Sequence, residues 1–91
     1  MPRAKIAALL NRRGNGETFQ FSSSAVVGAA YDPARRRLAL AYRGGGLYLY
    51  HDVTQAEFEA LKNAASAGEY VNHEIKPRHR YDVLRRAPSR D

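Results

Sequence analysis

Four groups of residues in this sequence could form a functional site. They are the histidines, a run of serines, a pair of tyrosines and clusters of arginine. His73 and His79 are six residues apart, a spacing that no common metal motif uses, and the chain has no cysteine to complete a zinc site. His51 precedes Asp52 directly, but adjacent residues of a strand face opposite ways. The serines at 22–24 lack the glycine-flanked pattern of a nucleophile elbow. These patterns predict a protein that is not an enzyme and that uses no metal or cofactor.

Two tyrosines, Tyr48 and Tyr50, alternate along a segment that is predicted to be a strand. Aromatic pairs on a strand can stack on the bases of single-stranded nucleic acid, at about 1–3 kcal/mol per base. The alternative is that both rings pack in the core. The register of the hairpin that contains them decides between these interpretations.

A triple glycine at 44–46 separates the two strands of this hairpin. A two-residue loop, 44–45, would turn the tyrosines away from the face that alternates from Leu38 to Tyr42. A three-residue loop, 43–45, pairs Tyr42 with Gly46, places Gly45 in the left-handed conformation, and puts the tyrosines on the Leu38–Tyr42 face. We favour the second loop, because the opposite face of the 38–43 strand carries only two alanines and an arginine. Tyr48, Tyr50 and Phe58 are therefore predicted to pack in the core.

Positive charge is concentrated in short stretches of the chain. Arg35, Arg36 and Arg37 follow a predicted turn, and Arg43 flanks the other hairpin loop. A larger group is interleaved with Tyr81 near the C-terminus: Lys76, Arg78, Arg80, Arg85 and Arg86. Such groups can contact phosphates of a nucleic acid. The alternative is that they are solvated charges with no specific partner.

The net charge of +6 lies entirely in the two ends of the chain. Residues 1–21 carry a net charge of +3 and residues 76–91 a net charge of +4, while residues 22–75 carry a net charge of −1. With 91 residues the chain is expected to form one small domain. No apolar run approaches the roughly 20 residues of a membrane-spanning helix, and the first apolar run is too short for a signal peptide. We expect a cytoplasmic protein with no membrane partner.

Periodicity predicts an α+β fold. Strands are expected at about 25–31, 36–43 and 47–51, forming a three-stranded antiparallel meander. The main helix is expected over 54–66, because Thr54 and Glu57 have capping-box spacing and Gly68 suits a C-terminal cap. A short second helix is expected over 69–75. The second face of so small a sheet needs a cover, either the N-terminal segment or a second subunit, so both a monomer and a homodimer are compatible with the sequence.

Two extensions flank the predicted domain at 22–80. Residues 1–21 are expected to contain a short helix over 4–13 and then, at 18–21, either an edge strand or a linker whose phenylalanines dock on the core. Residues 81–91 are expected to form a basic tail that docks once, through Tyr81, Val83 and Leu84.

Taken in order, several segments of this chain resemble the KTSC domain, a family named after the C-terminal region of some lysyl-tRNA synthetases. The matching residues are Ser22–Ser24, Gly28–Asp32, Leu38, Leu40, Tyr42, Gly45, Gly46, Tyr48–Tyr50, Val53, Phe58, Ala65–Asn72, Ile75 and Lys76. Thr54 departs from the proline common in the family. The resemblance covers roughly residues 22–80 and implies the same fold. Family members occur as small bacterial and phage proteins and as synthetase appendages, and that link is the basis for a suggested role in RNA binding.

The leading prediction is a non-enzymatic KTSC-type module that binds RNA or another nucleic acid through its basic tail and the arginine turn. The alternative is a protein–protein interaction module associated with the translation or transcription machinery, which would dock through the face or edge of the sheet.

Overall fold

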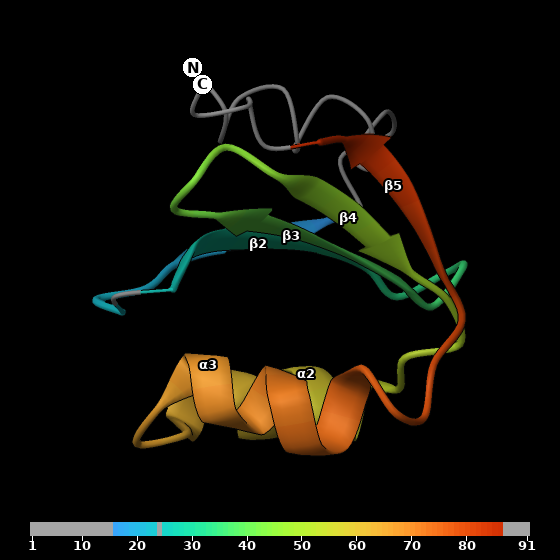
Figure 1. Ribbon diagram of the computed structural model, residues 1–91. Helices are drawn as coiled ribbons and strands as arrows, with labels where there is room; N and C mark the ends of the chain where they lie inside the picture. Colours follow the sequence, from blue (N-terminus) through green and yellow to red (C-terminus); the bar gives the residue numbers. More distant parts are fainter. Residues whose placement is uncertain (1–15, 24, 87–91) are drawn as a thin grey trace.

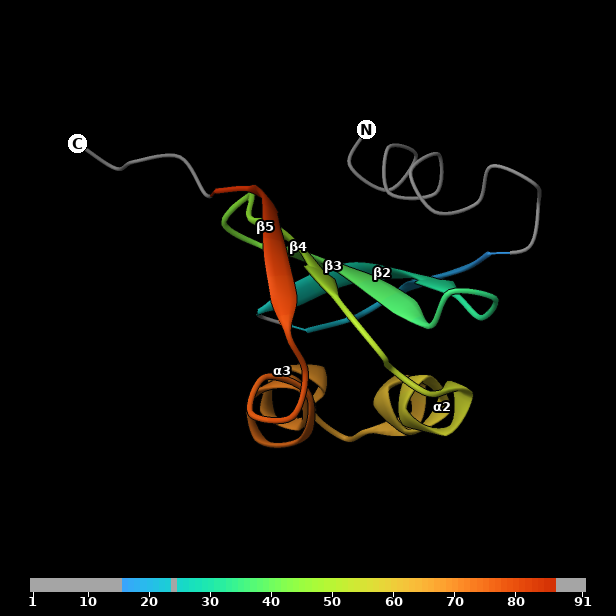
Figure 2. The same ribbon diagram turned by 90° about the vertical axis from the view of Figure 1, so that its right-hand side faces the viewer.

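The computed structural model describes residues 16–23 and 25–86, which form an antiparallel sheet with helices packed on one face (Figure 1). Figure 2 shows both helices, α2 and α3, on the same side of the sheet. Neighbouring strands in the sheet are also neighbours in sequence, in the order β1-β2-β3-β4-β5. The elements are β1 (Glu17–Gln20), β2 (Val26–Asp32), β3 (Arg37–Tyr42), β4 (Leu47–Tyr50), α2 (Gln55–Asn63), α3 (Ala67–Tyr70), the π-helical turn η1 (Val71–Ile75) and β5 (Tyr81–Arg85).

The fold is α+β as predicted, but the sheet has five strands where three were expected. The first addition is β1, which pairs with β2, so the edge-strand alternative for this segment is correct. The second is β5, which pairs with β4 from Tyr81 opposite Tyr50 to Arg85 opposite Leu47. The prediction of a loosely docked tail from residue 81 is therefore wrong for Tyr81–Arg85. The predicted helix over 4–13 and the last residues, 87–91, lie outside the described part of the chain.

The β3–β4 hairpin has the predicted three-residue loop. The amide of Tyr42 donates to the carbonyl oxygen of Gly46 at 2.9 Å, and Leu40 pairs with Tyr48. Gly45 has a φ of 105°, a conformation that suits glycine because it has no Cβ. This register places the side chains of Tyr48 and Tyr50 on the same face as those of Leu38 and Leu40.

The main core lies between this face of the sheet and the helices. Phe58 of α2 is fully buried, and its ring stacks on that of Tyr31 from β2 with the ring centroids 4.8 Å apart. The hydroxyl of Tyr31 donates to the carbonyl oxygen of Val53, so this buried polar group has a partner. Leu61 of α2 and Ile75 of η1 are also fully buried in this core.

The N-terminus of α2 has the predicted capping box. The Thr54 hydroxyl accepts from the Glu57 amide at 3.1 Å, and a Glu57 carboxylate oxygen accepts from the Thr54 amide at 2.8 Å. The helix ends at Asn63, earlier than predicted, since Ala64 is extended and Ser66 caps a new helix, α3. Gly68 is therefore not a C-terminal cap. It lies inside α3, where an added Cβ would come within 3.2 Å of the Ala25 side chain.

Gly45→Ala is expected to lower the free energy of unfolding by about 1–3 kcal/mol, because alanine is strained at a φ of 105°. Gly44→Ala is the matched control. It lies in the same loop without a positive φ and with open space around it, so its effect should stay within about 0.5 kcal/mol. Urea denaturation of both variants measures the difference. Equal effects would show that the loop does not depend on the conformation of Gly45.

Candidate functional site

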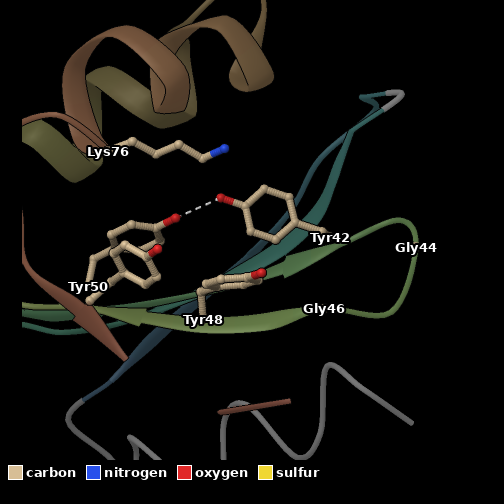
Figure 3. Close-up of a pocket in the computed structure, with 7 residues that line it drawn as sticks. Tyr42, Gly44, Gly46, Tyr48, Tyr50 and Lys76 are labelled. Atoms are coloured by element: carbon tan, nitrogen blue, oxygen red, sulfur yellow. Dashed lines mark hydrogen bonds between the residues drawn. The ribbon is translucent and has the colours of Figure 1, made fainter. Parts of the chain in front are cut away.

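A pocket of about 400 Å³ opens beside the β3–β4 loop and is walled by aromatic rings (Figure 3). Four of its residues are tyrosines that come from three adjacent strands, β3, β4 and β5. Its lining residues are Tyr42, Gly44, Gly46, Tyr48, Tyr50, Lys76 and Tyr81. The two glycines leave the loop side of the pocket without side chains.

The tyrosine rings form a continuous aromatic surface. Tyr42 meets Tyr48 edge to face with the ring centroids 5.3 Å apart. Tyr81 contacts Tyr48 and Tyr50 at centroid distances of 5.6 and 5.5 Å. Tyr50 is buried and Tyr48 half-buried, whereas half of the surface of Tyr81 is exposed. The outer rings of the pocket are thus open to solvent, whereas the inner ring, that of Tyr50, is part of the core.

The inner tyrosines are held in their neutral form. The hydroxyl oxygens of Tyr42 and Tyr50 are 2.9 Å apart and hydrogen-bonded. Burial raises the pKa of Tyr42 far above its ordinary value of 10.0, and the hydrogen bond with Tyr50 adds to that effect. Burial also raises the pKa of Tyr50. Neither phenol is available as a base at neutral pH, so these groups suit binding better than proton transfer.

Lys76 supplies the positive charge of the pocket. It follows η1, is exposed, and has its ammonium nitrogen 5.7 Å from the centroid of the Tyr42 ring. In Figure 3 its side chain extends toward the Tyr42 and Tyr50 hydroxyls. Within the described ranges, 16–23 and 25–86, Lys76 has no carboxylate in ion-pair distance. Its charge is thus available to an anionic group of a ligand.

The predicted arginine sites divide between the two ends of β3. Arg43 donates to the Ser23 carbonyl oxygen at 2.9 Å, and Nε of Arg85 donates to the Gly45 carbonyl oxygen at 3.0 Å, so both flank the pocket loop. At the opposite end, Arg35 and Arg36 lie in the β2–β3 turn and Arg37 is the first residue of β3. The structure therefore does not join the arginine turn to the tyrosines.

The positive charge of the arginine turn, Arg35–Arg37, is partly neutralised by a nearby buried carboxylate. Asp32, which is 1% exposed, lies 3.3 Å from a guanidinium nitrogen of Arg35 and 3.9 Å from one of Arg37. Its carboxylate also accepts from the Ala34 and Arg35 amides, which shapes the turn. These arginines thus stabilise a buried carboxylate, and less of their charge is available to a ligand.

The remaining predicted contacts are on the surface near the C-terminus. Arg78 is 3.2 Å from a carboxylate oxygen of Glu74, its neighbour one helical turn away. Arg80 and Arg86 are exposed on either side of β5. Because β5 is a strand, these charges have defined positions beside the sheet.

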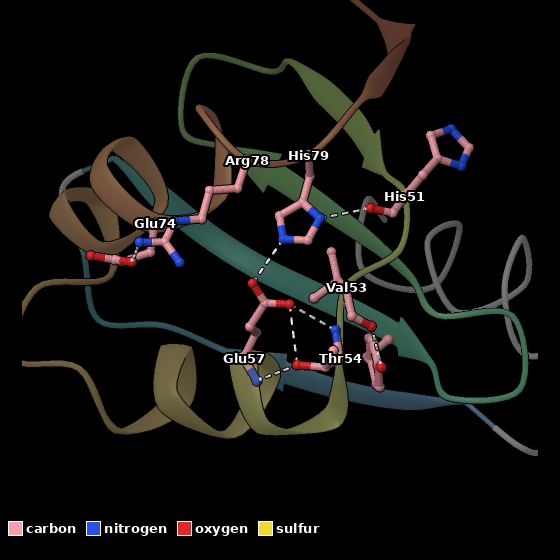
Figure 4. Close-up of polar contacts among 8 residues, drawn as sticks. His51, Val53, Thr54, Glu57, Glu74, Arg78 and His79 are labelled. Atoms are coloured by element: carbon pink, nitrogen blue, oxygen red, sulfur yellow. Dashed lines mark hydrogen bonds and ion pairs between the residues drawn. The ribbon is translucent and has the colours of Figure 1, made fainter.

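Sequence reasoning missed the role of His79. This side chain is 8% exposed and lies between the Glu57 carboxylate and the His51 carbonyl oxygen, each at 2.8 Å from a ring nitrogen (Figure 4). Each of the two ring nitrogens thus has a polar partner. The contact joins the segment before β5 to the cap of α2. No spacing rule could have found it, since Glu57 and His79 are 22 residues apart.

The described residues contain no group of three or more histidine, aspartate or glutamate side chains placed to hold a metal ion. No helix in ranges 16–23 and 25–86 is long and apolar enough to cross a membrane.

Comparisons with a family model and with a solved structure agree on one family. The family model of the KTSC domain matches residues 22–81 of this chain. A protein of Tsukamurella paurometabola is 48% identical over 62 residues, which cover 68% of this chain and 92% of that protein. The crystal structure of a KTSC domain protein from Yersinia pestis is similar, with a TM-score of 0.72 and 26% identity over 77% of this chain and 99% of that chain.

The contacts of Glu57 with Thr54 and His79 should make stability depend on pH. Burial alone would raise the pKa of Glu57, but its hydrogen bonds with Thr54 and His79 outweigh burial and lower the pKa below 4.5. A carboxylate with a lowered pKa contributes stability that is present above its unfolded pKa and is lost as the pH falls through its folded pKa. Glu57→Gln should cost about 1–3 kcal/mol at pH 7 and weaken the loss of stability in acid.

Thermal unfolding between pH 3 and pH 7 measures this dependence. Glu69→Gln is the control, because Glu69 is exposed and forms no ion pair with another described residue. It should retain the acid dependence of the parent protein. An unchanged pH profile for Glu57→Gln would contradict the assignment.

Proposed function

The chain belongs to the KTSC domain family, and we propose that it is a non-enzymatic module that binds single-stranded RNA through the tyrosine pocket. The single observation that carries the proposal is an exposed aromatic surface next to a cation with no acidic partner in the described chain. Such a role implies a cytoplasmic location.

Base stacking is the first part of the proposed mechanism. Tyr81 is 50% exposed and Tyr48 half-buried, so the outer part of the aromatic surface is open to a planar ligand. An unstacked base of a single strand can lie on such a surface whatever its sequence, because every base has a π face. A volume of about 400 Å³ is at the small end of the range for ligand pockets and suits one nucleotide.

Phosphate contact is the second part. The Lys76 ammonium lies at the edge of the same pocket, within reach of the sugar–phosphate backbone of a stacked nucleotide. Arg85 is anchored on the carbonyl oxygen of Gly45 and adds positive charge next to the loop that borders the pocket. The proposal thus moves the contact from a basic tail to Lys76, which lines the pocket, and to Arg85, which is held at the loop beside it.

A protein-interaction module is the second candidate, because β5 is an edge strand with an exposed Leu84 and Tyr81. An extended segment of a translation or transcription protein could add a strand there. Such a partner would protect the outward amides of β5 from hydrogen exchange, whereas a nucleotide in the pocket would not. Deleting residues 76–91 cannot separate the two candidates, since it would remove a strand of the sheet.

Tyr81→Leu should weaken binding of a single-stranded oligoribonucleotide about tenfold, because a stacking ring is worth about 1–3 kcal/mol. Fluorescence anisotropy at low salt measures the dissociation constant. Leu84→Ala is the control, since this exposed side chain is on the same strand and the opposite face. Absence of binding by the parent protein even at low salt would refute the proposal.

Lys76→Gln should weaken binding and reduce the dependence of affinity on salt, lowering the slope of log K against log salt by about 0.7. Arg35→Gln is the matched charge control, because Arg35 lies at the other end of β3. Titrations at several salt concentrations give both slopes. An equal change in the two variants would indicate general charge attraction in place of a site at the pocket.

A further inference from the structure

The face of the sheet that points away from α2 and α3 carries a second apolar cluster. Its members are Ala30, Ala39, Ala41, Leu47 and Leu49, with Val27 packed against them. Ala39 is 0% exposed and Leu49 only 8% exposed. This face is therefore largely buried.

No described element covers this second cluster. Both helices lie on the other face of the sheet, as the two views in Figures 1 and 2 show. Val27, the one half-buried apolar neighbour of the cluster among residues 16–23 and 25–86, belongs to the same sheet. An antiparallel sheet with one uncovered face would carry polar side chains there. The apolar composition indicates that a further segment packs on it.

The shape of the cluster suits a helix. Three adjacent strands spaced about 4.8 Å apart, each contributing about five residues of 3.4 Å, make a patch on the order of 250 Å². The alanines of β2 and β3 form its shallow centre, and Leu47 and Leu49 of β4 form one wall. A helix of ten residues is about 15 Å long and about 10 Å across, which matches these dimensions.

We propose that the occupant is the N-terminal segment of this same chain, residues 1–15, which packs on the second face through Ile6, Leu9 and Leu10. These three side chains fall on one side of a helix. The segment leads directly into β1 at the edge of the sheet, and the glycines at 14 and 16 permit the reversal onto the face. Residues 87–91 contain no large apolar side chain, so they do not compete.

A second copy of the chain fits this face less well. A standard interface buries about 800 Å² on each partner, roughly three times the area of this patch. The face is also nearly flat at its centre, because three of its side chains are alanines. A second sheet could therefore not interdigitate its side chains with this face. A segment already tethered to the edge strand needs no such area, because its effective concentration at the face is high.

A double-mutant cycle in the full chain tests the proposal. Leu9→Ala and Leu49→Ala should each lower Tm by about 5–10 °C, and the double variant should lower it by at least about 2 °C less than the sum. The control cycle joins Leu9→Ala to Leu61→Ala, which lies in the main core, and its shifts should add. If Leu49→Ala does not fold, Leu49→Val gives a milder change at the same position.

Two further measurements complete the test. Ala8→Asp, on the opposite side of the expected helix, should leave Tm nearly unchanged, whereas Leu9→Asp should lower it strongly. The chain should sediment as a monomer with a Tm independent of protein concentration. Additive shifts in the Leu9–Leu49 cycle, or an unchanged Tm for Leu9→Asp, would overturn the proposal. A concentration-dependent Tm would overturn it in favour of a second copy.

Discussion

The register of the β3–β4 hairpin determines which side chains each face of this sheet presents. Tyr42 and Gly46 close a three-residue loop, and Gly45 provides the positive φ that the loop needs. A slip of one residue would exchange the two faces of β4, because side chains alternate along a strand. It would put Leu47 and Leu49 under the helices and the tyrosines on the other side. The core, the pocket and the second apolar cluster all depend on this one loop.

Contacts between distant parts of the chain complete the pocket. His79 joins the Glu57 carboxylate to the His51 carbonyl oxygen, which fixes the segment between η1 and β5 against the start of α2. From this anchor β5 runs beside β4 and carries Tyr81 to the rings of Tyr48 and Tyr50. Lys76 reaches the same rings from the end of η1. The aromatic surface and its cation are thus products of tertiary packing.

The distribution of charge has two different consequences in this fold. In the β2–β3 turn, a buried Asp32 engages two arginines, so that much of the positive charge stabilises the protein itself. At the pocket end, Arg43 and Arg85 donate to the carbonyl oxygens of Ser23 and Gly45, which orients their guanidinium groups. The positive charge that has no carboxylate in ion-pair distance among the described residues, and that lies next to the tyrosines, is that of Lys76. This asymmetry distinguishes the two ends of β3, both of which carry arginine in the sequence.

Local patterns in the sequence determine much of this protein. Alternation predicts β2, β3 and β4, capping-box spacing predicts the start of α2, and the triple glycine predicts the loop and hence the face on which Tyr48 and Tyr50 lie. These features follow from the sequence because each depends on residues close together in the chain. Only the tertiary structure decides that Tyr81–Arg85 is a strand, that His79 is a buried link, and that Lys76 and Tyr81 meet the hairpin tyrosines. A short edge strand has weak periodicity of its own, and its conformation depends on the unpaired backbone of a neighbour more than thirty residues away.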